Sequence, residues 1–237
     1  MPARPKTLPA IATNPAPDGG SGGAPLPAGL HQKAYQMLRR AVMSGRFRPG
    51  EKLSMRQIAK ATNIGLTPVR EALVRLIGEG ALETTYQRSA RIPVMSKARI
   101  LEIMQLRMML EGHAAERAAA QITAEEIEQL QIISLEILAA RQRQDVSLDI
   151  LKIYEFHFAL YRAARSRDLL MLIESLWLRT GPYLNLLFPD YTKHRYGEGR
   201  GRIIAALSKR DGKSARKEVE IDIRDALTYV AETFAPP

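Results

Sequence analysis

Threonine, proline and two arginines occur together in a short stretch whose residue types suit contact with a polyanion. Thr67 has the side chain of a helix N-cap, and Pro68 suits the first helical position, where its missing N–H costs nothing. Arg70 and Arg75 follow among apolar residues. The free N–H groups of a helix start favour a phosphate, and an arginine reaches a phosphate or a guanine edge. These residues indicate a helix that presents its N-terminus to nucleic acid.

A second helix and a hairpin are predicted on either side of this stretch. Ser54 begins a capping-box pattern with glutamine three residues on, and the helix it opens is expected to end at residues 63–65. Two short helices joined by a tight, glycine-containing turn form a helix-turn-helix. Residues 81–94 have β-type residues on both sides of Arg88, which predicts a hairpin with a basic tip. The second helix would lie in a major groove, with the hairpin as a wing on the backbone or minor groove.

Other elements must position the predicted second helix and the hairpin. Residues 31–44 predict a helix that Gly45 ends, and residues 46–54 have the composition of a connector. The apolar stripe of that first helix is Tyr35, Leu38 and Val42. In the helix from Thr67, Glu71 and Arg75 are spaced i, i+4 in the favourable order and predict an ion pair. The inward face of the same helix consists of Val69, Ala72, Leu73 and Leu76.

The net charge of +10 is concentrated in the N-terminal third. Residues 1–96 contain 14 Lys and Arg against 5 Asp and Glu, whereas residues 97–237 contain 21 against 20. A basic segment beside a nearly neutral one indicates a polyanion-binding module joined to another domain. The alternative is a small helical domain whose arginines are merely solvated. Capped helices, a glycine turn and a basic hairpin in one segment favour DNA.

Composition excludes several classes of protein. The chain has no cysteine, so disulfides and thiolate metal sites are excluded. It has no run of about 18 apolar residues, so no membrane span and no membrane partner are expected. Residues 1–28 are rich in Pro, Gly, Ala and Ser and lack the apolar core of a signal peptide. We expect them to form a disordered tail, and the protein to be cytoplasmic.

The segment from Leu38 to Leu82 resembles the winged-helix domain of the GntR family of bacterial transcriptional regulators almost without gaps. The stretch TPVREAL and the pair Pro49-Gly50 belong to that signature. The resemblance implies DNA-contacting positions in both helices and in the wing. These positions are Arg56, Thr67, Arg70 and Arg88. Pro68 and Arg75, on the same predicted helix as Thr67, complete the candidate DNA-binding set. Gly65-Leu66 departs from the Ser/Thr-Arg that relatives often carry, which leaves the base preference open.

Beyond Ser96 the sequence predicts six or seven helices and no strand-rich stretch, which is a helical bundle. Thr123 opens a capping box with Glu126, and a break is expected near Gly181-Pro182. The predicted helices cover about 24 residues from 96, then residues from 124, 149–165, 169–187, 200–209 and 211–233.

Two residues of this bundle have side chains suited to a ligand. Arg107 lies on an apolar helix face, either as an ion-pair partner of Glu111 or as an anchor for an anionic ligand. His157 shares an aromatic-rich helix with Tyr161. It is either a core histidine with one hydrogen bond or a group that faces a ligand.

Residues 97–235 resemble the FCD effector domain of the FadR-type branch of the GntR family. LEIMQLRMMLEGHAAERAA and FHFALYRAARSRDLLMLIESLWLR carry the resemblance, in the expected order. It implies a dimerisation domain with a small carboxylate-type ligand between its helices, often held by a divalent metal. Arg107 and the Phe156-His157 pair match positions that line this cavity.

Metal-binding relatives place an acid four residues before that histidine and two histidines on the last two helices. Here the matching positions hold Ile153, Arg200 and Asp222. A guanidinium cannot ligate a metal, so no metal cofactor is expected. Arg200 could instead pair with a carboxylate, with Asp222 orienting that ligand or His157. The candidate effector-binding set is Arg107, His157, Tyr161, Arg200 and Asp222.

The sequence therefore predicts a mostly α protein with a tail over residues 1–28, a winged helix-turn-helix domain over 29–95 and a helical effector-binding and dimerisation domain over 96–237. The predicted function is a ligand-responsive DNA-binding regulator. It is expected to act as a homodimeric repressor of a metabolic operon, released from a palindromic operator by a small anionic carboxylate. Two alternatives remain: a DNA-binding protein with no effector, and an enzyme with an accessory DNA-binding domain. No nucleophile–base pair or phosphate loop supports an enzyme.

Overall fold

The structure is a computed structural model that describes residues 28–85, 89–187, 198–234 and 236. Apart from Ala28, the predicted tail over residues 1–28 lies outside the described residues, as does Arg88. Contacts divide the chain into two compact units. The first consists of the residues up to Val42 together with residues 50–93, and the second consists of residues 43–49 and 94–237. The fold is mostly α, as predicted. No helix of the described ranges is long and apolar enough to cross a membrane.

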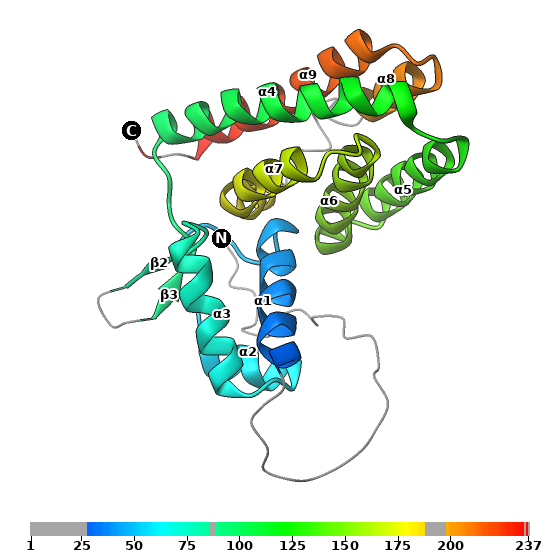
Figure 1. Ribbon diagram of the computed structural model, residues 1–237. Helices are drawn as coiled ribbons and strands as arrows, with labels where there is room; N and C mark the ends of the chain where they lie inside the picture. The colour runs from blue at the N-terminus through cyan, green and yellow to red at the C-terminus, as the bar shows by residue number, and fades with distance from the viewer. Residues whose placement is uncertain (1–27, 86–88, 188–197, 235, 237) are drawn as a thin grey trace. The chain divides into compact units, whose positions relative to one another are not determined.

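The first unit is a winged helix-turn-helix with three helices and a small antiparallel sheet (Figure 1). Its helices are α1 (Ala28–Met43), α2 (Met55–Thr62) and α3 (Leu66–Gly78). Its strands, in the order β1-β3-β2, are β1 (Lys52–Leu53), β2 (Glu83–Thr84) and β3 (Ala90–Arg91). Strands β2 and β3 form the predicted hairpin, whose tip at residues 86–88 is outside the described ranges.

Most local signals in this unit act as predicted. The stripe of Tyr35, Leu38 and Val42 is buried, which packs α1 on the unit's interior. Ser54 caps α2 by accepting a hydrogen bond from the Gln57 backbone N–H at 3.4 Å. Asn63, at φ 54°, ends α2 in the left-handed conformation that asparagine tolerates.

Two predictions about element boundaries in this unit are wrong. Thr67 is not the N-cap of α3: the helix begins at Leu66 with Gly65 as its cap, and no side chain caps it. Pro68 therefore occupies the third helical position, where the backbone N–H would also lack an intrahelical partner. The segment 46–54, predicted as a connector only, contains β1, because Lys52 and Leu53 pair with Arg91 and Ala90 of the wing.

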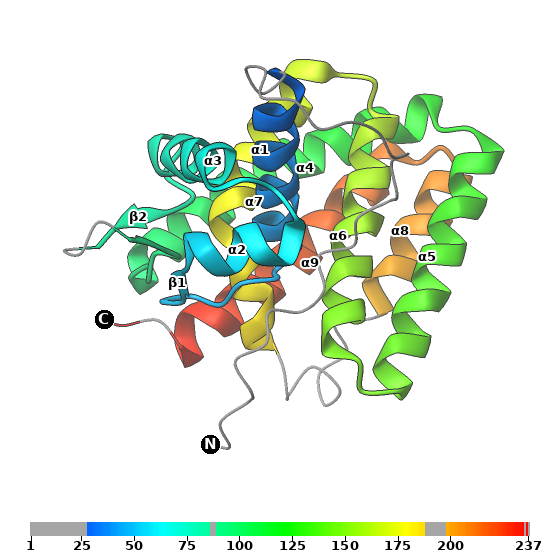
Figure 2. The same ribbon diagram turned by 90° about the horizontal axis from the view of Figure 1, so that it is seen from below.

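The second unit is a helical bundle in which α4 packs along α9, as Figure 1 shows, while α5 packs against α6 and α8 (Figure 2). Its elements are α4 (Lys97–Gln121), α5 (Ala124–Gln142), α6 (Val146–Ala163), α7 (Arg167–Thr180), the 3₁₀ helix η1 (Gly181–Leu187), α8 (Glu198–Ser208) and α9 (Gly212–Thr233).

Side-chain caps set several boundaries of this bundle. Thr123 and Glu126 form the predicted capping box, with reciprocal bonds of 3.1 and 3.2 Å. Asp145 and Asp211 cap α6 and α9. The break predicted near Gly181-Pro182 is confirmed, because α7 ends at Thr180 and the chain continues as η1. These boundaries place α4, α6, α7, η1 and α9 around one cavity.

Candidate functional site

A groove in the first unit brings together two of the predicted DNA contacts. Arg56 at the start of α2 and Arg70 on α3 both line it, and both side chains are exposed. The groove encloses about 450 Å³ between these helices and the sheet. Within the described ranges neither guanidinium has an ion-pair partner. Two uncompensated cations therefore face one open groove, which suits a polyanion.

The start of α3 adds backbone donors next to these arginines. Gly65 offers no side-chain oxygen to the first turn, and the first intrahelical bond runs from the Val69 N–H to the Gly65 carbonyl at 3.4 Å. Thr67 is exposed there, and its hydroxyl does not cap the helix. The N–H groups of this turn and the helix dipole thus favour an anion.

The remaining predicted contacts of this unit are placed differently. Arg75 lies over the Tyr35 ring, 3.6 Å from its centroid, and pairs with Glu79 at 3.2 Å. The predicted Glu71–Arg75 pair is wrong: Glu71 instead contacts His31 Nδ1 at 2.5 Å. Glu71 finds its partner on α1, whereas Arg75 pairs with the residue that ends α3. Pro68 is buried.

Arg75 belongs to a small cluster that joins α3 to α1. The Tyr35 hydroxyl donates to Glu79 Oε1 at 2.6 Å, on the same carboxylate that Arg75 contacts. Burial and this hydrogen bond raise the pKa of the Tyr35 phenol. Among the predicted DNA contacts, Arg75 is therefore engaged in holding the two helices together.

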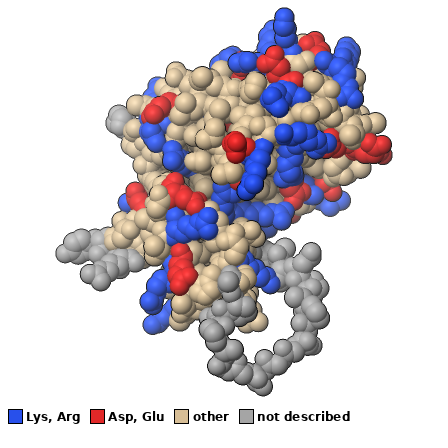
Figure 3. All heavy atoms as spheres, viewed as in Figure 1, with Lys and Arg blue, Asp and Glu red and all other residues tan. Residues whose placement is uncertain are grey.

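The overall distribution of charge on the face drawn in Figure 3 does not by itself identify a DNA-binding surface. Figure 3 shows Lys and Arg side chains interspersed with Asp and Glu on the face that it draws. The positions of Arg56 and Arg70, rather than total charge, identify the candidate interface.

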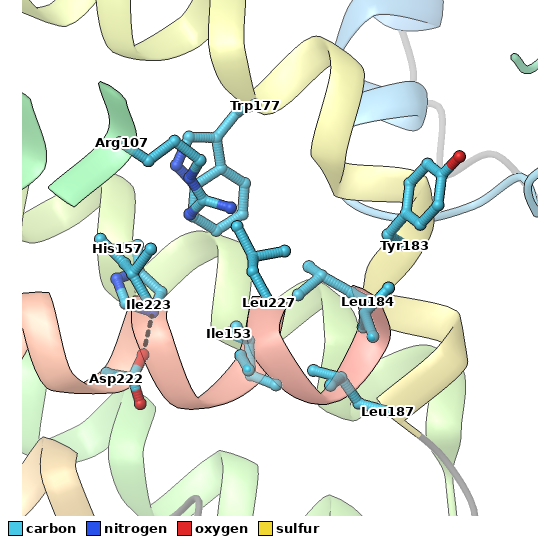
Figure 4. Close-up of a pocket in the computed structure, with 12 residues that line it drawn as sticks. Arg107, Ile153, His157, Trp177, Tyr183, Leu184, Leu187, Asp222, Ile223 and Leu227 are labelled. Carbon is cyan, nitrogen blue, oxygen red and sulfur yellow. Dashed lines mark ion pairs between the residues drawn. The ribbon is translucent and has the colours of Figure 1, made fainter. Parts of the chain in front are cut away.

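In the second unit, Arg107, His157 and Asp222 line one cavity together with Trp177 (Figure 4). Its volume is about 30 Å³, room for roughly one water molecule. The rest of the wall is mainly apolar and consists of Ile153, Tyr183, Leu184, Leu187, Ile223, Ala226, Leu227 and Val230. Polar groups thus occupy one end of a small, largely apolar chamber.

Arg107 is the predicted ion-pair partner of Glu111, and it is also part of the cavity wall. Its Nε lies 2.5 Å from Glu111 Oε1 and its Nη2 lies 3.1 Å from Oε2, while Nη1 donates to Thr180 Oγ1 at 3.1 Å. The guanidinium carbon also lies 4.3 Å from the Trp177 ring centroid. Burial alone would lower the pKa of Arg107, but the Glu111 charge and hydrogen bond raise it, so the group stays charged.

A chain of hydrogen bonds connects Glu111 to Asp222. The Tyr161 hydroxyl donates to Glu111 Oε2 at 2.5 Å, and His157 Nδ1 lies 2.9 Å from the same hydroxyl. Because Tyr161 gives its only proton to Glu111, the ring N–H at Nδ1 is the donor to Tyr161. His157 Nε2 lies 3.3 Å from Asp222 Oδ2, so a proton there also has an acceptor. The two ring nitrogens of His157 therefore lie between two acceptors, the Tyr161 hydroxyl and the Asp222 carboxylate.

Burial and neighbouring charges determine the protonation states of Tyr161 and Asp222 in this chain of contacts. Burial and the Glu111 charge raise the pKa of Tyr161 well above its ordinary value, so it remains a phenol. Burial alone would raise the pKa of Asp222, but the hydrogen bond and charge of His157 lower it, with smaller contributions from Arg200 and Arg107. Asp222 is therefore a carboxylate at neutral pH.

Arg200 on α8 is almost fully buried, with 2% of its surface exposed. Its Nε and Nη2 atoms, which form the side edge of the guanidinium, have no hydrogen-bond partner among the described residues. Its charge contributes to the lowered pKa of Asp222. Burial raises the pKa of Asp149, against the opposing effects of Arg141, paired with it at 2.9 Å, and of Arg200. Arg200 does not line the cavity itself, but its unused binding edge belongs to a charge that acts on Asp222, which does.

Sequence reasoning placed Arg107, His157 and Asp222 at this site but missed two contributors. Trp177 is one of them, because nothing in its local sequence pattern indicates that it lies beneath Arg107. Glu111 was considered only as a partner of Arg107, and its i, i+4 spacing was the available signal. Tyr161 lies behind the cavity wall, where it bridges Glu111 and His157.

The donor set is a poor fit for a divalent metal. Of the side chains that line the cavity, only His157 and Asp222 could ligate one, and they already contact each other. Within the described residues no three His, Asp or Glu side chains form a metal-binding group. Ile153 and Arg107 complete this end of the wall, and neither supplies a metal ligand.

Comparison with known proteins assigns both units to families. The model for bacterial regulatory proteins of the gntR family matches residues 30–92, and the FCD domain model matches residues 102–224. The chain is 28% identical over 182 residues to the HTH-type transcriptional regulator McbR of Escherichia coli K12, covering 76% of this chain and 82% of that protein. It is 28% identical over 216 residues to the Uxu operon transcriptional regulator of the same strain, covering 78% and 80%.

Solved structures give the same assignment. The structure of E. coli McbR/YncC superimposes with a TM-score of 0.79 at 25% identity, over 86% of this chain and 98% of that one. A GntR regulator from Rhodococcus sp. RHA1, with a TM-score of 0.69 at 20% identity, shares the fold over 87% and 100%. The winged helix with its exposed cationic groove and the helical bundle with its buried cavity thus correspond to the two matched domains. The chain belongs to the GntR family of DNA-binding transcriptional regulators and carries an FCD effector domain.

Proposed function

We propose that this regulator is a repressor that a small carboxylate releases from a palindromic operator. The observation that carries the proposal is the unpaired edge of Arg200, buried beside Asp222 in the effector domain. Arg107 is paired with Glu111, and Asp222 contacts His157, whereas this edge of Arg200 has no hydrogen-bond partner among the described residues. A buried cation without a partner is costly, so an entering anion would be strongly favoured.

The shape of the cavity constrains the effector. Its apolar wall, with Leu184, Leu187 and Leu227, suits a short hydrocarbon part, while the polar end suits a carboxylate. A volume of about 30 Å³ is too small for such a molecule without displacement of the wall. Effector binding would therefore be coupled to a rearrangement of the domain.

Operator binding by the first unit follows from the groove and the start of α3. In this proposal Arg70 contacts a base edge or phosphate in the major groove, Arg56 contacts the backbone, and the wing around Arg88 contacts the flanking backbone or minor groove. Thr67 is exposed at the first turn of α3 and is placed to contact a phosphate.

A gel shift on the intergenic DNA beside the protein's own gene tests the proposal. Purified protein is titrated with and without a panel of short mono- and dicarboxylates. We expect one of these to weaken operator binding. The matched variant Arg200→Met, which keeps the length but removes the cation, should bind the operator and ignore the effector. An effector response that survives in this variant would contradict the role of Arg200.

A second candidate function is DNA binding with no small-molecule effector, and the small volume of the cavity favours it. The same experiment separates the two. If no carboxylate of the panel changes operator affinity, and none raises the melting temperature of the protein, the cavity is a structural polar cluster rather than a ligand site.

We also propose that the protein acts as a homodimer through its effector domain. Exposed apolar side chains on α4 and α7, two helices that pack against each other, support this: Leu106, Met109, Met171 and Leu172. Met109→Glu with Met171→Glu should give a monomer in sedimentation at micromolar concentration. Leu135→Glu, on an exposed apolar position of α5, is the control and should remain dimeric.

Finally, we propose that the effector domain works without a transition metal, because Ile153 and Arg200 occupy positions at which metal-binding relatives carry ligands. Elemental analysis of protein purified without chelator or affinity-tag metal tests this. A stoichiometric amount of zinc, nickel or manganese that is lost in His157→Ala would contradict it.

A further inference from the structure

The 3₁₀ helix η1 lies between the cavity and the segments through which the chain passes from one unit to the other. The chain passes between units after Val42, after Pro49 and after Pro93. The segments on the second unit's side of these points are residues 43–49 and the residues that begin at Val94. Both segments are attached to η1, and we call them the linkers.

The first linker is attached through Asn185. Its Nδ2 donates to the Gly45 carbonyl at 2.6 Å and the Phe47 carbonyl at 3.1 Å, and also lies 3.1 Å from the Pro182 carbonyl. Phe47 is buried, with 2% of its surface exposed. One amide group therefore fixes two backbone positions of this linker.

Two glycines allow the backbones of η1 and this linker to touch. A Cβ on Gly181 would lie 2.3 Å from the Met43 carbonyl oxygen, which is impossible without displacement. Gly45 has φ +66°, and a Cβ there would lie 3.1 Å from the Gly181 carbonyl oxygen. The contact is thus close enough that η1 and the linker cannot move independently.

The second linker is attached through Tyr183. The Met95 backbone N–H donates to the Tyr183 hydroxyl at 2.6 Å, one residue before Ser96 caps α4. Tyr183 is 3% exposed, and it also lines the cavity. The same side chain therefore touches the cavity and this linker.

The other side of η1 forms part of the cavity wall. Leu184 and Leu187 both line the cavity, as expected for residues three apart, which are eclipsed in a 3₁₀ helix. Asn185, one position on from Leu184, is directed to the first linker instead. Upstream, Thr180 accepts a hydrogen bond from Arg107 and precedes η1 directly. Poor 3₁₀ hydrogen-bond geometry makes such a segment easier to shift than an α-helix.

We infer that η1 transmits the state of the cavity to both linkers, with Asn185 and Tyr183 as the positioning residues. The inference rests on the proposed effector site, and it specifies how that site is regulated. A group that enlarges the cavity must displace its neighbours, and Leu184 and Leu187 belong to the shortest element of the wall. Displacement of η1 moves the Asn185 amide and the Tyr183 hydroxyl together, and with them residues 45–47 and 95.

A test without any effector uses Leu187→Phe, which enlarges the side chain that faces the cavity. Operator affinity of the full chain is measured by gel shift for this variant, for Asn185→Ala with Tyr183→Phe, and for all three changes combined. Leu187→Phe should change the dissociation constant at least about fivefold, the lower range of allosteric coupling. The same change should have less than half this effect, on a logarithmic scale, when both attachments are removed.

The control is Leu130→Phe, an equal enlargement at a buried position of α5 in the same domain. It should lower the melting temperature comparably and leave operator affinity unchanged. If Leu187→Phe has no effect on affinity, or the same effect with and without the attachments, the inference is overturned.

Tyr183→Phe alone provides a second measurement if the enlarged variants do not fold. Loss of the hydroxyl should speed hydrogen exchange at the Met95 amide and change operator affinity in the same full-length protein. Faster exchange with unchanged affinity would overturn the transmission role. None of these measurements uses a carboxylate, so they still test the transmission through η1 if the proposed effector is wrong.

Discussion

Arg70 and Arg107 both lie on helices, yet their surroundings are opposite. Arg70 is exposed in an open groove and has no ion-pair partner among the described residues. Arg107 is 4% exposed, pairs through two nitrogens with Glu111 and lies over Trp177. An exposed, uncompensated cation can exchange its counterions for a polyanion, whereas a buried and compensated one fixes local geometry. The positive charge that Arg70 and Arg107 share does not distinguish a DNA-contacting arginine from one in an effector cavity. Their burial and their ion pairing do distinguish them.

The largest expected effect breaks the buried pair. Glu111→Ala should lower the free energy of unfolding by about 3–5 kcal/mol, because it leaves the Arg107 charge buried without its partner. It also removes the acceptor of Tyr161. Chemical denaturation of both proteins measures the difference.

A matched control lies on the same helix. Glu102 pairs with Arg99 at 2.6 Å on the exposed face of α4, so Glu102→Ala should cost less than about 1 kcal/mol. Similar losses in the two variants would show that burial does not determine what these pairs contribute.

The next effect concerns the groove. Arg70→Ala should weaken operator binding by roughly 1–3 kcal/mol if the guanidinium makes a bidentate base contact, with little change in stability. Arg75→Ala should act in the opposite sense, lowering stability more than affinity, because Arg75 contacts Tyr35 and Glu79. Titration of operator DNA with each variant, alongside thermal melting, separates the two roles. Equal affinity losses would place Arg75 at the interface after all.

A smaller, sequence-independent effect is expected at the wing. Arg88→Ala should weaken binding to operator and unrelated DNA alike and reduce the slope of log affinity against log salt by about one unit, as for one phosphate contact. Affinities measured over a series of salt concentrations test this. A loss confined to the operator would indicate base recognition instead.

The smallest effect is a pH dependence of the buried site. The pKa of Asp222 is lower in the folded protein than in an unfolded chain, so its ionised form contributes stability above the unfolded value of roughly 3.9. That contribution should be lost as the pH falls through the folded pKa. His157, Arg200 and Arg107 are the charged groups that act on this carboxyl. Stability measured between neutral and acidic pH should therefore fall less steeply in Asp222→Asn, and identical slopes would count against the assignment.

The elements that the sequence predicted well are those with local signals. The Ser54 cap, the Thr123–Glu126 box and the break at Gly181-Pro182 each depend on a few neighbouring residues, and all three occur as predicted. The helical bundle follows from the same kind of signal, because its helix boundaries are marked by caps and turns.

The features that the sequence missed depend on distant partners. Strand β1 exists because Leu53 pairs with Ala90, and Glu71 contacts His31 on α1 rather than Arg75 on its own helix. The Thr67 cap failed because Gly65, with φ −59° and ψ 157°, is the N-cap, so the helix begins two residues earlier than predicted. In the effector cavity, residues were identifiable by type, but the position of Trp177 under Arg107 required the three-dimensional packing of α4 against α7.

The place of Trp177 has a practical consequence. It is the only tryptophan of the chain, and its ring lines the cavity with 1% of its surface exposed. Excited at the red edge of its absorption, where the eight tyrosines do not contribute, the protein should emit blue-shifted light that acrylamide quenches poorly. An occupant that separates Arg107 from this ring, or lets water in, would change the spectrum. The effector domain thus contains its own optical probe, and ligand screening requires no label.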